Sequence, residues 1–211
     1  MSEEGKIDNL TMRIWLQTLD STVGPGGLKS ILHYAHLGKY IDNLPQHNDD
    51  LDIPVADIHI LVLNLVELFG QKGARALQLH AGHEFFRIGM METGPIVKAL
   101  QMTARILPEA KRMKLVLDKL AEESEKRYPT PHKPRIEVVE EKEFFLYSDK
   151  GNLESQGVIS ETPVCGVAAG LLSALVEWIT GNPHKVEEIQ CRAMGDPADV
   201  FRIWKAHRDD T

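Results

Sequence analysis

The chain has few cysteines, no long apolar run and no excess of basic residues, and each absence excludes a class of protein. Two cysteines among 211 residues argue against a disulfide framework. The longest apolar run, residues 58–69, is interrupted by polar side chains and is too short to span a bilayer. A formal charge of −7, without clustered Lys and Arg, argues against nucleic acid and anionic membranes as partners. With an acidic start and no signal peptide, we expect a cytoplasmic protein.

Catalytic signatures are also missing. The sequence has no G-x-G-x-x-G after an expected strand, no G-x-x-x-x-G-K and no G-x-S-x-G. A reductase in the ordinary sense needs a nicotinamide or flavin site, and no motif for one is present. We therefore assign no catalytic residues.

Apolar residues recur at helical spacing through the first part of the chain. Gly82, in the middle of one such segment, costs about 1 kcal/mol relative to Ala, which indicates a close contact with another element. The pattern predicts five helices, over approximately residues 28–36, 55–69, 74–90, 95–106 and 108–127.

Prolines at 129, 131 and 134 forbid helix and mark a change of class. Two strands are expected after them, around 136–138 and 144–147, and two more around 186–194 and 200–204. Segregated helices and strands predict an α+β fold with helices on one face of a four-stranded antiparallel sheet. We expect an N-terminal extension, 1–25, and one domain, 26–211, with a helical part, 26–128, and a strand-helix-strand part, 134–206.

The segment from Thr162 to Phe201 holds both cysteines. Thr162 and Pro163 are start signals for a helix that reaches about Thr180. This start places Cys165 in the first turn, where the helix dipole would lower the pKa of its thiol. One face of the helix carries small residues that let another backbone approach: Gly166, Ala169, Gly170 and Ser173.

A hairpin around residues 195–197 would bring several ligand atoms to the cysteines. Cys165, Glu188, Cys191 and Asp199 then form an acceptable tetrahedral set for one zinc ion. Because residues 188 and 191 would face opposite sides of a regular strand, this set requires a bulge or an early strand end. The other interpretation of the cysteines is two inert buried thiols.

From Cys165 onward the sequence resembles the C-terminal half of the 4-vinyl reductase domain family. The resemblance rests on Cys165-Gly166, Gly170-Leu171-Leu172, Glu188-x-x-Cys191, Gly195 and Phe201. In the family's hydrocarbon-sensing domains a Cys, a Glu, a Cys and a final Cys hold zinc, which implies the same four positions here with Asp199 replacing the last Cys. The family's fold is shared with subunits of the TRAPP vesicle-tethering complex, and the expected order of helices and strands is similar to that fold.

The resemblance implies a carrier or sensor of hydrophobic small molecules. One branch of the family acts in bacteriochlorophyll biosynthesis, within photosynthesis, so the ligand could be a tetrapyrrole intermediate. The alternatives are an enzyme that uses zinc or Cys165, and a dimeric scaffold. A homodimer through helical surface is expected from the fold resemblance and the apolar helix faces.

Two further groups on the third expected helix were weighed. Phe85, Phe86 and Met90 are soft apolar residues that could line a ligand pocket, although most such groups are simply core. His80 and His83, with Glu84, have the spacing of a metal-binding helix face, but two partly exposed histidines beside a core helix are the commoner outcome.

Overall fold

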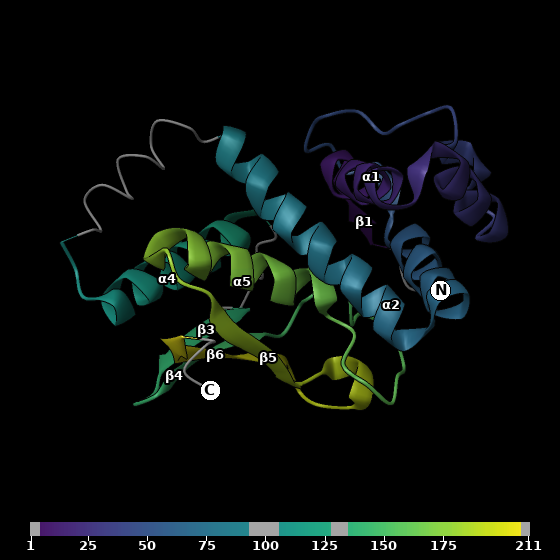
Figure 1. Cartoon of the computed structure of the whole chain (residues 1–211). Helices are drawn as coiled ribbons and strands as arrows, with labels where there is room; N and C mark the ends of the chain where they lie inside the picture. The colour runs from purple at the N-terminus through teal and green to yellow at the C-terminus, as the bar shows by residue number, and fades with distance from the viewer. Residues whose placement is uncertain (1–4, 93–105, 128–134, 208–211) are drawn as a thin grey trace.

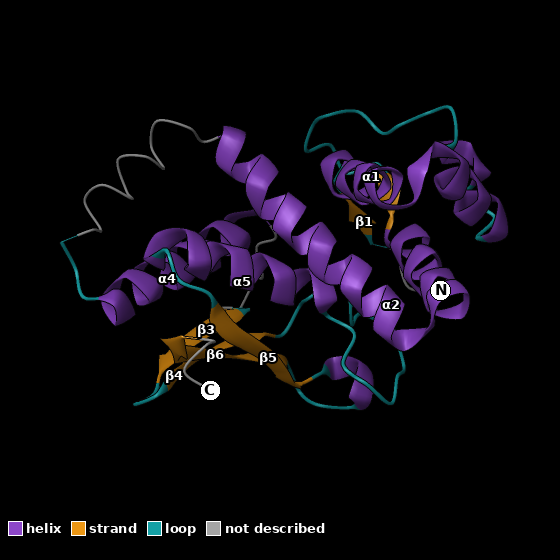
Figure 2. Cartoon of the chain, viewed as in Figure 1, coloured by secondary structure: helices purple, strands orange, loops and turns teal. Residues whose placement is uncertain are grey.

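The computed structural model describes residues 5–92, 106–127 and 135–207, and in these ranges the helices lie on one side of a single four-stranded sheet (Figures 1 and 2). All three strand pairs are antiparallel. The predicted α+β class is therefore confirmed. The strand order is β3-β4-β6-β5, with β3 at Ile136–Glu140, β4 at Phe144–Asp149, β5 at His184–Gln190 and β6 at Asp199–His207.

Two helices cover the sheet directly. In β4, buried and half-buried residues alternate, as expected for a strand with one face on a core. Helix α5, Gly166–Thr180, and helix α4, Glu109–Arg127, supply the facing side chains. The resulting sheet-side cluster includes Phe145, Phe201, Ile203, Leu172, Val176, Met113 and Leu117.

The start predicted for α5 is wrong by several residues. Cys165 is the N-cap and Gly166 is the first helical residue, so Thr162 lies outside the helix. Gly166 N–H bonds to the carbonyl of Val164 at 2.9 Å, which shows that the chain is still turning there. The apolar pattern from 166 to 180 was correct, but the cap and proline signals lie too early in the sequence.

The other two helices form a second layer away from the sheet. Helix α2, Val55–Glu92, contains the two helices predicted at 55–69 and 74–90, with a break at Gly70, where φ is 69°. Helix α1, Asn9–Tyr34, has a similar break at Gly24, where φ is 76°. A short pair of strands, β1 at Lys6–Ile7 and β2 at Ile53–Pro54, joins the starts of these two helices.

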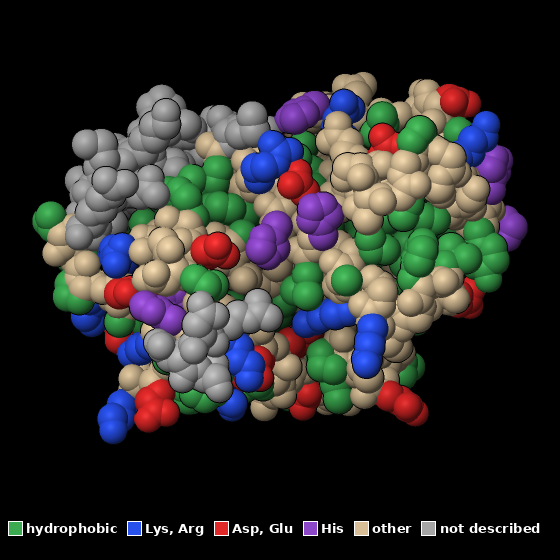
Figure 3. Space-filling view, viewed as in Figure 1, with side chains coloured by type: hydrophobic (Ala, Val, Ile, Leu, Met, Phe, Trp, Pro, Cys, Tyr) green, Lys and Arg blue, Asp and Glu red, His purple; other side chains and the backbone are tan. Residues whose placement is uncertain are grey.

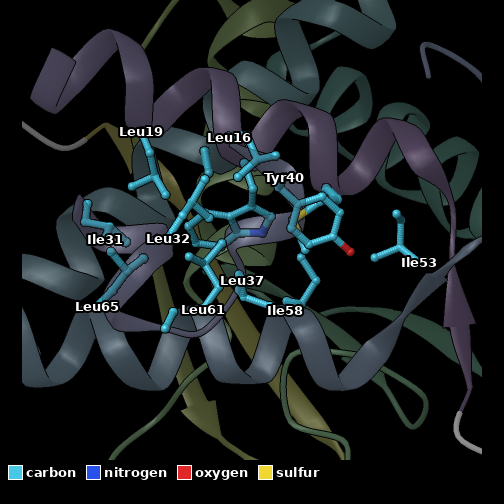
Figure 4. Packing of buried hydrophobic residues seen from close by; sticks show 14 of the residues in the cluster. Leu16, Leu19, Ile31, Leu32, Leu37, Tyr40, Ile53, Ile58, Leu61 and Leu65 are labelled. Carbon is cyan, nitrogen blue, oxygen red and sulfur yellow. The ribbon is translucent and has the colours of Figure 1, made fainter. Parts of the chain in front are cut away.

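The N-terminal residues are part of the core. Trp15, Leu16 and Leu19 of α1 are at most 2% exposed and pack in one cluster with Leu61 and Leu65 of α2 (Figure 4). The boundary that we expected between residues 25 and 26 falls inside α1. We call this group the N-terminal cluster.

Helices α2 and α5 cross with their backbones in direct contact. A Cβ atom built on Gly82 would lie 2.2 Å from the carbonyl oxygen of Val167, and one built on Gly170 would lie 2.2 Å from that of Leu79. Only glycine fits at either position without movement of backbone. The close contact predicted for Gly82 and the small face predicted for α5 thus meet each other.

The helix expected at 95–106 and the proline-containing linker fall almost entirely outside the described residues. None of the helices in the described ranges combines the length and apolar character needed to cross a membrane. On the face shown in Figure 3, charged side chains of both signs are interspersed. This arrangement agrees with the lack of a basic patch in the sequence.

The helix crossing gives a stability prediction. We expect Gly82→Ala to lower the free energy of unfolding by about 3 kcal/mol, because the added methyl group overlaps backbone atoms that cannot rotate away. Chemical denaturation measures the change. The control is Gly26→Ala in α1, where nothing lies within 4 Å of the added atom and stability should stay level or rise by up to about 1 kcal/mol. Equal effects of the two substitutions would contradict the crossing.

Candidate metal centre and adjoining cavities

The four residues expected to bind zinc come together at the turn end of the β5–β6 hairpin. One ligand atom from each of Cys165, Glu188, Cys191 and Asp199 lies within 4.8 Å of all the others. In a tetrahedral zinc site these separations would be roughly 3.4–3.8 Å, so modest closure would complete the site. Both sulfur-bearing residues and Asp199 are fully buried.

The backbone resolves the strand-parity problem in both expected ways. The register of β5 shifts between Glu188 and Gln190, which is a bulge or irregularity. The strand then ends at Gln190, so Cys191 is already outside it. A short 3-10 helix, Arg192–Met194, follows before β6 begins at Asp199. The irregular backbone turns Glu188 and Cys191 to the same side.

Each carboxylate is held by a donor from a different part of the chain. Glu188 accepts a bond from the N–H of Cys165, at 3.1 Å to its Oε2, and pairs with Arg75 of α2 at 3.1 Å. Asp199 accepts from the Ser155 hydroxyl at 2.6 Å and from the N–H of Arg192 at 2.7 Å. Carboxylate oxygens keep further lone pairs for a metal, and such outer contacts are typical of metal-ligating carboxylates.

The expectation that the helix dipole lowers the pKa of Cys165 is wrong. A hydrogen bond with the Cys191 thiol, burial, and the negative charges of Glu154, Glu188 and Asp199 together raise the pKa of the Cys165 thiol. These contributions outweigh the half-charge of one helix end. A divalent cation would reverse their sign, because it stabilises thiolate and carboxylate together. The donor set and its excess negative charge therefore fit zinc.

Glu154 connects this centre with the start of α5. Its carboxylate accepts bonds from the N–H groups of Val167 and Ala168, both at 2.8 Å. Burial raises the pKa of Glu154 to about 8, although the two N–H bonds oppose that shift. Sequence reasoning missed Glu154, Ser155 and Arg75, because no motif marks a residue that holds a ligand from outside.

The three residues expected to line a pocket are not gathered around one space. Phe85 packs against the N-terminal cluster, whereas Phe86 packs in the sheet-side cluster with its ring centroid 5.9 Å from that of Trp178. Met90 is half-buried further along α2. Neighbouring residues on a helix point in different directions, so Phe85 and Phe86 face different clusters.

Phe85 does line a small apolar cavity of about 70 Å³. It lies between both halves of α2, the start of α5 and α1, and its other lining residues include Trp15, Ile58, Leu153, Glu154 and Val167. A larger and more open cavity of about 300 Å³ lies between the two halves of α1 and residues 41–44. Sequence reasoning did not find the larger cavity.

His80 and His83 are exposed on α2, and Glu84 pairs with Arg87 at 2.7 Å. The three do not form a metal group within the part of the chain that the structure describes. The commoner interpretation, exposed histidines beside a core helix, describes them.

Comparison with protein families supports the resemblance over the segment that carries the metal centre. Residues 150–205 match the family model of the 4-vinyl reductase domain. This match supports the relationship to that family and spans all four candidate ligands. No curated protein sequence matches the chain significantly.

Solved structures similar to the whole fold are H-NOX proteins. The chain superimposes on an Fe(II) unliganded H-NOX protein from K. algicida with a TM-score of 0.60 and 13% identity, covering 95% of this chain and 97% of that one. For a mutant H-NOX protein from S. oneidensis in the Fe(II) ligation state the values are 0.61, 12%, 96% and 98%. A third structure, from work on heme distortion in the H-NOX family, gives 0.56, 15%, 95% and 96%. At these identities the similarity establishes the fold alone, and the likeness to TRAPP subunits stays a prediction.

Proposed function

We propose that this protein binds a hydrophobic small molecule and presents it to another protein without transforming it, as a carrier or sensor. A zinc ion held by Cys165, Glu188, Cys191 and Asp199 would fix the loops beside the ligand. The observation that carries the proposal is the assembly of four suitable ligand atoms within 4.8 Å, inside the segment that matches the 4-vinyl reductase domain.

The zinc would have a structural role. Its four protein ligands leave no open position, which is the arrangement of structural rather than catalytic sites. The ion would tie the start of α5 to both strands of the β5–β6 hairpin, because Cys165 caps the helix while Glu188 and Asp199 belong to the strands. Asp199 is a harder ligand than the family's Cys, so we expect weaker zinc binding than a three-thiolate site gives.

The ligand would enter the cavity beside Phe85. That cavity is apolar and carries one carboxylate, from Glu154. A drug-sized ligand needs roughly 300–1,000 Å³, so the cavity of about 70 Å³ must widen. A tetrapyrrole intermediate of bacteriochlorophyll biosynthesis is the ligand that the family resemblance suggests, and heme, named for an H-NOX structure of similar fold, is also a tetrapyrrole.

The cavity and the metal centre share one short loop. Leu153 and Glu154 line the cavity, and the next residue, Ser155, donates its hydroxyl hydrogen to Asp199 at 2.6 Å. His59 of α2 lies 2.8 Å from the carbonyl oxygen of Leu153 and holds the same loop from the other side. A ligand that displaces this loop would therefore change the hydrogen bonding of a metal ligand, which favours a sensor.

The metal assignment can be tested by cobalt substitution. Co²⁺ bound through cysteine should give sulfur-to-metal charge-transfer absorption, and Cys191→Ser should remove it and weaken metal binding at this site at least about 100-fold. Asp199→Cys, which restores the family's ligand set, should strengthen both signals. Glu187→Gln is the matched control, because Glu187 lies beside Glu188 but contacts Lys185 and Trp204. Absence of the thiolate absorption in the wild-type protein would refute the zinc proposal.

The ligand site can be tested with protoporphyrin as the probe. We expect Phe85→Ala to weaken its binding about tenfold or more, because a Phe side chain contributes about 1.5–3 kcal/mol on burial. Phe86→Ala should lower stability but leave the affinity unchanged, since Phe86 packs on Trp178 instead. Calorimetric titration measures both.

Two results would contradict this proposal. Equal loss of affinity in the two Phe variants would move the ligand away from the Phe85 cavity. Reduction of a vinyl group on a tetrapyrrole by the purified protein, given only NADPH, would replace the carrier with an enzyme.

We also propose a homodimer through the exposed apolar surface of α2. Ile60, Leu63 and Leu68 are 38%, 55% and 43% exposed, respectively. Light scattering at micromolar concentration should give twice the chain mass, and Leu63→Lys should give the monomer mass because it places a charge in the interface. A monomeric wild-type protein would remove this proposal.

A further inference from the structure

A second group of potential metal ligands lies at the opposite end of the β5–β6 hairpin from the cysteines. His184 near the start of β5 is the register partner of His207 at the end of β6. Glu109, in the first turn of α4, reaches both. One ligand atom from each of the three lies within 4.8 Å of the others. Residues 109 and 207 fall outside the segment that matches the family model.

The hydrogen positions on His184 carry the argument. Its side chain is 0% exposed. Its Nδ1 lies 3.0 Å from the carbonyl oxygen of Trp204, and its Nε2 lies 3.0 Å from Oε1 of Glu109. Both oxygens are acceptors, but a neutral imidazole has only one N–H to donate. The second nitrogen must therefore face either an added proton or a metal cation.

The oxygen at the centre of the group is crowded with donors. Oε1 of Glu109 lies 3.0 Å from Nε2 of His184, 2.9 Å from Nε2 of His207 and 3.3 Å from Nδ2 of Asn182. A carboxylate oxygen has two lone pairs, one fewer than these three contacts. A cation between the oxygen and the two ring nitrogens would replace two ring protons and relieve the crowding.

We propose that Glu109, His184 and His207 bind a divalent first-row transition-metal ion such as Zn²⁺. Two imidazoles and one carboxylate form a recognised protein site for such ions and a poor one for Mg²⁺ or Ca²⁺. The N–H from Nδ1 of His184 to a backbone carbonyl is the outer contact that orients a metal-binding histidine. Three protein ligands leave the fourth position open to water or a small anion.

The group can adjust to the ion. Zinc–nitrogen and zinc–oxygen bonds of about 2.0–2.2 Å place ligand atoms roughly 3.3–3.5 Å apart, a few tenths of an ångström beyond the 2.9 and 3.0 Å seen here. The side chains of Glu109 and His207 are 28% and 39% exposed and have room to move. Bound metal would join the start of α4 to the end of the sheet. This site is independent of the proposed zinc at the cysteines.

Nitrogen NMR of the histidine rings in the full-length protein tests the proposal directly. Addition of Zn²⁺ should move the Nε2 signals of His184 and His207 to metal-bound positions while Nδ1 of His184 keeps its proton. Retention of two ring protons on His184, with no response to Zn²⁺, would overturn the proposal and define a charged hydrogen-bond network.

Variants separate this site from the thiolate site. His207→Gln should weaken Zn²⁺ binding here at least about 100-fold, while the cobalt–thiolate absorption persists. His33→Gln, an exposed histidine on α1, is the control and should change neither signal. Equal Zn²⁺ affinity at the His184 ring in the His207→Gln variant and the wild type would also refute the site.

Discussion

The direct backbone contact between α2 and α5 is the constraint on which the rest of the molecule depends. Because Gly82 and Gly170 let the two helices touch, the neighbouring turns of α2 reach the start of α5. Gln78 bonds to the carbonyl of Val164 at 3.2 Å, and Arg75, one turn earlier, pairs with Glu188. One face of one helix thus sets both the crossing and the position of a candidate metal ligand.

Much of this arrangement could be predicted from residue type and spacing. The alternation of strand residues indicated the sheet, and the glycines indicated the close contact before any partner for it was known. The odd spacing of Glu188 and Cys191 required a bulge or an early strand end, and the protein has both. Such features are local, so a single sequence contains them.

What could not be predicted depends on contacts between distant residues. The pKa of Cys165 follows from Cys191 and three carboxylates that are brought near by folding, and these outweigh the local effect of the helix end. Glu109, His184 and His207 meet across 75 and 98 positions of sequence without a motif. Phe85 and Phe86, adjacent in sequence, enter different clusters because the space on each side of α2 is filled by different elements.

The way α5 is covered has a consequence for what counts as a domain. Residues 150–205 match a family model as one unit, yet the face of α5 that carries Gly170 is closed by α2, which lies outside that unit. Separated from α2, the matched segment would expose this face and leave Glu188 without Arg75. The length of chain that is recognisable by its sequence is therefore shorter than the length that must fold together, and a shortened gene that encodes only the recognisable part would specify an incomplete protein.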